Sequence, residues 1–205
     1  MSNYKFLVLV AKDCSPQEWL RVWADRYSQD DDPEYEYLIE RRNSLSAEDF
    51  ERIGKWKDGV KTELQWKPNV ASVAYRIWME AAQELPRCPE DGQVKAFLDC
   101  WSGRTYTDAF TSRSVEKHFG PPRATTLLHF LSGGRFPIFD SRVRKAFARL
   151  SGGPAPPNTV AWYLDSYCTF FSELASICGC EVDTSRKLDK ALFSYGAVET
   201  LTFST

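Results

Sequence analysis

The sequence predicts a mostly α-helical protein, and three observations lead to that prediction. Signals for the start of a helix recur along the chain, beginning with the capping box Ser15-Pro16-Gln17-Glu18. Apolar residues follow a helical spacing over 70–85, and Pro86 ends that pattern. Only residues 4–10 have the composition of a strand. We therefore expect one helical domain over residues 1–205, either as a simple bundle or as two lobes with a site between them.

The N-terminal half should contain four helices. The first covers about 16–27, after the capping box. The acidic loop 30–32 should cap the second helix, and the signal at 46–49 should start the third. The amphipathic pattern over 70–85 is the fourth.

Six more helices should follow residue 90. Gly196 should end the last of them as a left-handed cap. The Gly- and Pro-rich segment 151–157 should form a stiff surface loop between two helices. The expected helices cover residues 92–101, 112–118, 123–131, 141–150, 158–178 and 185–195.

The composition is that of a globular protein. Hydrophobic residues make up 43% of the chain and aromatic residues 14%, which excludes a disordered protein. No apolar stretch reaches the length of a membrane-spanning helix, and the run Phe6–Val10 is too short for the core of a signal peptide. We therefore expect a cytoplasmic monomer without a membrane partner.

The cysteines and histidines do not predict a metal site. The six Cys are scattered, and the close pair Cys178 and Cys180 lacks the two-residue spacing of a zinc site. Only two His are present. We expect structural or free thiols, no metal and no cofactor.

Positive charge is concentrated in one part of an otherwise acidic chain. The net charge is −2, yet residues 113–149 hold eight basic side chains against two acidic ones. Such a region can bind a phosphate backbone locally, although a solvated helical surface would have the same charges. The basic residues are Arg113, Lys117, Arg123, Arg135, Arg142, Arg144, Lys145 and Arg149.

Residues 113–150 resemble the helix-hairpin-helix DNA glycosylases. A helix ending near Lys117 leads to a Gly120-Pro121 turn, then to Arg123 at the start of an apolar helix. Backbone N–H groups at such a turn bind a phosphate oxygen without reading sequence. The resemblance implies that Gly120, Arg123 and Thr125 contact DNA, with Arg113 and Lys117 beside them. The chain departs from the family pattern at the second hairpin Gly, which is Pro122 here and lacks an N–H.

The resemblance continues to Asp140, which follows an apolar run and stands 17 positions after Arg123. A helix with Arg142, Lys145 and Arg149 on a basic face comes next, and the resemblance implies that Arg142 and Lys145 contact DNA. In the family, the corresponding Asp is catalytic. Cleavage of an N-glycosidic bond builds positive charge on the deoxyribose, and a carboxylate near C1′ stabilises that charge and orients or deprotonates the attacking water. An Asp before a helix is also a common N-cap, and the two roles are compatible.

The resemblance implies a monofunctional glycosylase that flips a modified base out of DNA and leaves an abasic site. Family members that also cut the backbone use a Lys, and Ala124 stands at that position here. The bulky, hypermodified bases of phage DNA are one candidate substrate class, which leaves repair and antiviral defence both open. Two alternatives remain, namely an inert DNA-binding module that kept the hairpin fold, and a structural helical domain that binds protein or RNA.

Overall fold

The computed structural model describes residues 14–27, 32–58, 80–81, 91–101, 106–107, 114–115, 120–180 and 185–198. The described part of the chain is mostly helical, as the sequence predicts. The chain divides into two compact units, one formed by 1–31 and 137–205 and the other by 32–136. No helix among the described residues combines the length and apolar character that crossing a membrane would require.

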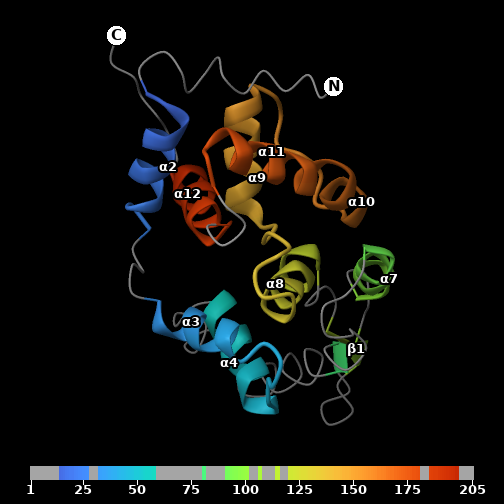
Figure 1. Cartoon of the computed structure of the whole chain (residues 1–205). Helices are drawn as coiled ribbons and strands as arrows, with labels where there is room; N and C mark the ends of the chain where they lie inside the picture. The colour runs from blue at the N-terminus through green and yellow to red at the C-terminus, as the bar shows by residue number, and fades with distance from the viewer. Residues whose placement is uncertain are drawn as a thin grey trace. The chain divides into compact units, whose positions relative to one another are not determined.

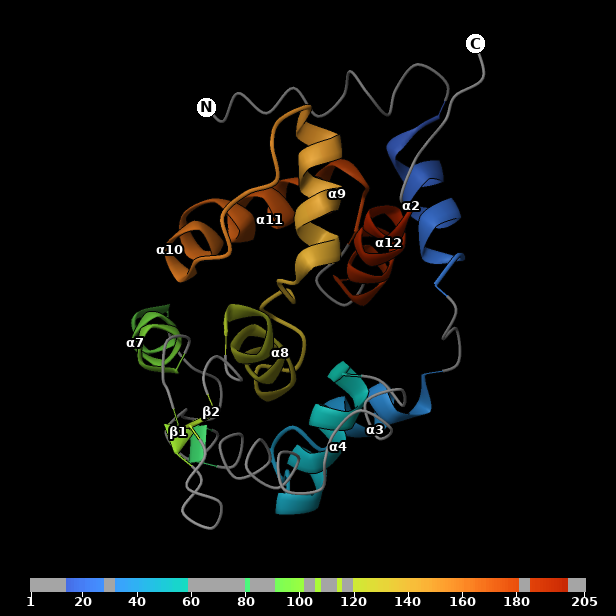
Figure 2. The same cartoon turned by 180° about the vertical axis from the view of Figure 1, so that it is seen from behind.

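The first unit is built around its C-terminal helix. Helix α12 packs against both α9 and α2, and Figures 1 and 2 show it between them. The rings of Trp19 and Trp23 on α2 meet the ring of Tyr195 edge-on, with centroids 5.6 and 4.9 Å apart. These contacts form the apolar core between α2 and α12. The helices of this unit are α2 (Pro16–Ala24), α9 (Ser141–Ser151), α10 (Val160–Trp162), α11 (Cys168–Ile177) and α12 (Ser185–Ala197).

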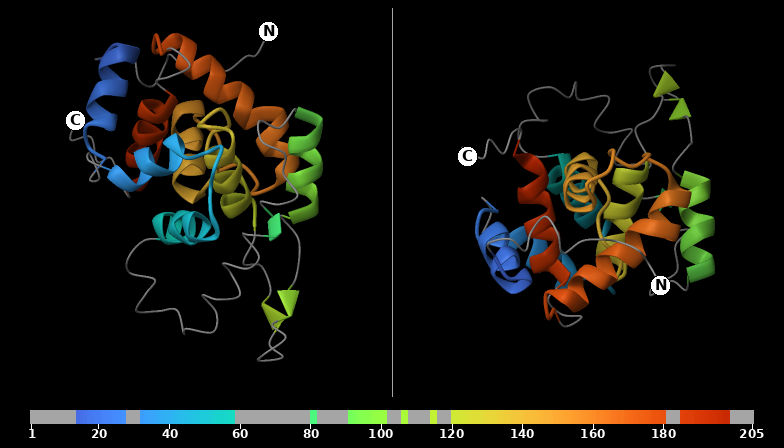
Figure 3. Two further views of the ribbon diagram at one scale, coloured as in Figure 1. Left: turned by 60° about the horizontal axis from the view of Figure 1, so that its bottom comes forward. Right: turned by 90° about the horizontal axis from the view of Figure 1, so that it is seen from above.

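The predicted helix over 158–178 is confirmed as one run with an internal irregularity. Helix α10 continues into a π-helical turn, η1 (Tyr163–Tyr167), and then into α11, and Figure 3 shows them as one long rod. A π turn inserts one extra residue into the helix, and such turns often occur at functional sites. Residues 152–159 join this run to α9, close to the loop predicted at 151–157.

The role of Gly196 differs from the predicted one. Gly196 lies inside α12 and is not a left-handed cap. A Cβ at Gly196 would lie 1.8 Å from the Arg142 carbonyl oxygen, so this glycine allows α12 to approach α9 closely. Left-handed glycines instead follow α9, at Gly152 with φ of +68°, and α11, at Gly179 with φ of +67°.

The second unit places α8 against three other helices. Helix α8 (Pro121–Leu131) packs against α3 (Pro33–Glu40), α4 (Ala47–Asp58) and α7 (Asp91–Trp101). The predicted caps are confirmed. The Asp32 carboxylate accepts a hydrogen bond from the Tyr35 N–H at the start of α3. At the start of α4, the hydroxyl of Ser46 and the carboxylate of Asp49 accept each other's backbone N–H in a capping box.

His129 is a buried core residue of the second unit. Its Nε2 lies 2.8 Å from the Tyr35 hydroxyl and its Nδ1 lies 2.8 Å from the Phe136 carbonyl oxygen. A carbonyl can only accept, so Nδ1 donates to Phe136 and, in a neutral ring, Nε2 accepts from Tyr35. The imidazole thus ties α8 to α3 and to the segment that follows α8.

The helix expected over 112–118 is wrong. Ser114–Val115 form strand β2, which pairs antiparallel with strand β1 (Tyr106–Thr107). Thr, Ser and Val have weak helix propensity, and pairing with a second strand outweighs it here. The expected strand over 4–10 lies outside the described residues, as does most of the helix over 70–85, of which Glu80 and Ala81 are helical.

Candidate functional site

Asp140 caps α9, as the sequence predicts. Its Oδ1 accepts hydrogen bonds from the backbone N–H groups of Arg142 at 2.9 Å and Val143 at 3.1 Å. The preceding residues, Ile138 and Phe139, are buried and anchor the backbone that leads into the cap. The Asp140 carboxylate is therefore half-buried and fixed, at the positive end of a helix that favours negative charge.

Aromatic rings surround the residue before Asp140. The Phe139 ring stacks on Trp162 at a centroid distance of 5.5 Å and lies 5.1 Å from the ring of Tyr167. Phe147 meets Trp162 edge-on at 4.8 Å. Trp162 keeps part of its surface exposed, whereas Phe139 and Tyr167 are fully buried. These contacts hold the start of α9 against the α10–η1 segment.

The basic residues of α9 have two different roles. The guanidinium groups of Arg144 and Arg149 bind backbone carbonyl oxygens, of Pro156 for Arg144 and of Tyr195 and Val198 for Arg149. The two side chains therefore hold loops and helices together. Because Arg149 is engaged in this way, the basic face of α9 is smaller than predicted.

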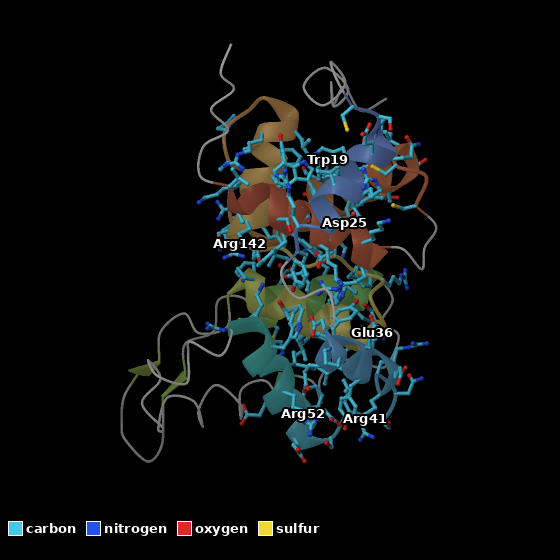
Figure 4. The ribbon with its side chains drawn as sticks, turned by 90° about the vertical axis from the view of Figure 1, so that its left-hand side faces the viewer. Trp19, Asp25, Glu36, Arg41, Arg52 and Arg142 are labelled. Carbon is cyan, nitrogen blue, oxygen red and sulfur yellow. The ribbon has the colours of Figure 1, made fainter. Side chains whose placement is uncertain are left out.

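Arg142 and Lys145 are exposed on α9, as the predicted DNA contact requires. The Arg142 guanidinium lies 4.1 Å from the centroid of the Phe193 ring on α12, so it is held at a defined place on the surface. Figure 4 labels Arg142 beside α9. The two side chains are three positions apart and share one face of the helix.

The start of α8 differs from the phosphate-binding turn expected from the sequence. Gly120 is its N-cap, and the first two helical residues are Pro121 and Pro122, which have no N–H. The next two N–H groups, of Arg123 and Ala124, both donate to the Gly120 carbonyl oxygen. The first four positions of α8 therefore offer no unengaged backbone donor. The two prolines remove backbone donors that a phosphate could bind at the start of α8, and the contact of Gly120 with DNA stays a prediction.

The remaining predicted DNA contacts separate into three cases. Arg123 is half-buried at the start of α8. Thr125 is fully buried, and its hydroxyl donates to the Pro122 carbonyl oxygen at 3.2 Å, so it belongs to the interior rather than to a DNA-binding surface. Arg113 and Lys117 lie outside the described residues.

Sequence reasoning missed a buried polar cluster in the first unit. Asp189 on α12 accepts a hydrogen bond from Arg186 at 2.8 Å, and Arg186 also donates to the Tyr27 hydroxyl at 3.2 Å. Burial, followed by the charges of Asp189 and Asp140, raises the pKa of the Tyr167 hydroxyl well above its ordinary value. The i,i+3 pair Arg186 and Asp189 beside the apolar Leu188 was the signal that could have indicated it.

The described residues contain no group of three or more His, Cys, Asp or Glu side chains arranged to hold a metal ion. In comparisons with protein-family models, with curated proteins and with solved structures, nothing matches this chain. Its function must therefore be inferred from its own residues.

Proposed function

We propose that this chain is a divergent helix-hairpin-helix glycosylase, a monofunctional DNA N-glycosylase with Asp140 as its catalytic carboxylate. One observation carries the proposal: Asp140 is a fixed, half-buried carboxylate at the head of α9, a helix that exposes Arg142 and Lys145. The two cations supply charge for a phosphate backbone, and the carboxylate supplies the negative charge that the reaction requires.

The reaction uses water and no covalent enzyme intermediate. As the bond between C1′ and the base nitrogen breaks, its electron pair leaves with the base and positive charge develops on the sugar. The Asp140 carboxylate stabilises that charge and accepts a proton from the water that bonds to C1′. The departing base takes up a proton, so the products are the free base and an abasic deoxyribose. Ala124 cannot form a Schiff base, so the strand stays intact until alkali or heat is applied.

The substrate class that we propose is DNA with a modified base, including the bulky bases of phage DNA. A base must leave the stack before its glycosidic bond can be reached. The partly exposed indole of Trp162, which contacts the residue before Asp140, is a surface on which such a base could stack.

A second candidate function is an inert DNA-binding module. The observation that favours it is the start of α8, where Pro121 and Pro122 remove the backbone donors that hold phosphate in the resembled family. Strand β2 also stands where the first hairpin helix was expected. On this alternative, Arg142 and Lys145 would bind DNA while Asp140 acts only as a cap.

The Asp140→Asn variant separates the two candidates. Asn caps helices about as well as Asp, so α9 should form normally while the charge is lost. The native protein should release base from DNAs that carry different modified bases, read by mass analysis of the released base. The variant should bind the same DNA and lose excision by at least about 100-fold, the scale of one electrostatic contact to the transition state.

The matched control is Asp25→Asn. Asp25 is an exposed carboxylate in the same unit, paired with Arg21 on the surface of α2. Its substitution changes the net charge by the same amount but should leave excision unchanged. Full activity of Asp140→Asn would remove Asp140 from the site. Absence of excision by the native protein on a broad panel, with DNA binding retained, would favour the inert module.

A further inference from the structure

The hydroxyl of Tyr167 is a buried polar group with no hydrogen-bond partner among the described residues. The residue is fully buried, at 0% exposure. Buried hydroxyl groups nearly always have a partner, because leaving one unsatisfied costs the free energy of its lost hydration. An ordered water is the usual partner where protein atoms do not supply one.

Two carboxylates act on this hydroxyl, and both belong to the first unit. Asp189, on α12, and Asp140, at the head of α9, are among the causes that raise the pKa of Tyr167, after burial. The hydroxyl therefore keeps its proton and is a donor, whereas both carboxylates are acceptors.

Ring packing also places Tyr167 beside the residue that precedes Asp140. The Tyr167 ring lies 5.1 Å from the ring of Phe139, the residue directly before Asp140. Tyr167 ends the π-helical turn η1, and π turns often place side chains at functional sites. The neighbouring Tyr163 is satisfied differently, since its hydroxyl donates to the Pro137 carbonyl oxygen at 3.0 Å.

We propose that Tyr167 is a positioning residue for Asp140: its hydroxyl holds an ordered water that hydrogen-bonds the carboxylates of Asp189 and Asp140. A water needs two to four polar partners, and the hydroxyl and the two carboxylates would supply three. The water would fix the orientation of the Asp140 carboxylate from its buried side. The effect of this water on catalysis rests on the proposed function, whereas the water site itself does not depend on that function.

Tyr167→Phe tests the proposal, with Tyr163→Phe as its matched control. Both variants remove one buried hydroxyl from the same turn and keep the ring. If the water is present, Tyr167→Phe loses a hydrogen bond and should lower the melting temperature by about 2–4 °C, as Tyr163→Phe should. A melting temperature equal to or above the native value would mean that the hydroxyl has no partner, and would overturn the proposal.

Excision under single-turnover conditions tests the positioning role. Tyr167→Phe should lower the excision rate by about 10- to 100-fold, because a misplaced carboxylate stabilises the transition state poorly. DNA affinity should not change, and Tyr163→Phe should keep most of the native rate. An unchanged rate in Tyr167→Phe would overturn the positioning role. If the native protein excises no base, the proposed function fails and the positioning role with it. A lowered melting temperature would then still support the water site.

Discussion

Gly196→Ala tests the close approach of α12 to α9. A Cβ at this position would lie 1.8 Å from the Arg142 carbonyl oxygen and 2.5 Å from its carbon, where ordinary contact is 3.4–4 Å. Both are backbone atoms, so no side chain can move aside. The helices would have to separate locally by about 1.5–2 Å in an interior that packs as densely as an organic crystal.

The expected cost follows from two opposing effects. Overpacking of this kind costs about 1–3 kcal/mol, and sometimes more. Replacing Gly by Ala inside a helix returns up to about 1 kcal/mol, and less near the end of a helix, where Gly196 lies. We therefore expect a net destabilisation of about 2 kcal/mol, which lowers the melting temperature of a chain of this size by about 4–8 °C.

Thermal melting followed by circular dichroism measures the effect. Gly92→Ala is the matched control, because Gly92 lies in α7 and a Cβ there would meet nothing within 4 Å. The control should be neutral, or more stable by up to about 1 kcal/mol. If Gly196→Ala melts at or above the native temperature, the close packing of α12 on α9 is refuted.

Two further predictions concern charge. Burial raises the pKa of Asp49, but hydrogen bonds from the Ser46 N–H and hydroxyl, together with Arg41, outweigh burial and lower it. The stabilisation from Asp49 is then present above the ordinary Asp pKa of about 4 and is lost as the pH falls through the lowered value. Asp49→Asn should therefore make the urea midpoint of unfolding depend less on pH in acid. Equal acid sensitivity of the variant and the native protein would contradict this. Lys145→Ala should weaken DNA binding and reduce the slope of log affinity against log salt by about 1, whereas Lys95→Ala, at an exposed ion pair on α7, should change neither.

The helix starts could be predicted because each depends on a few adjacent residues. Ser15, Asp32 and Asp140 all cap the helices expected of them, through hydrogen bonds that span only two or three positions. The catalytic candidate could be found for the same reason. Its carboxylate, its cap and the basic helix after it form one continuous segment.

The side-chain roles could not be predicted, because their partners come from distant positions. Arg149 was expected on a basic surface, but it binds carbonyl oxygens of Tyr195 and Val198. Thr125 was expected to contact DNA, but the packing of α8 in the second unit buries it. Strand β2 formed where a helix was expected, because residues 106–107 pair with it.

The sequence by itself determined where most of the described helices begin and that Asp140 stands at the head of a basic helix. Those features follow from local hydrogen bonding and from a period of 3.6 residues. The tertiary structure decided which cations remain at the surface, why Gly196 must lack a side chain, and that the buried Tyr167 adjoins the start of α9. Each of these depends on atoms that packing brings together from separate helices, and no local pattern records such an approach.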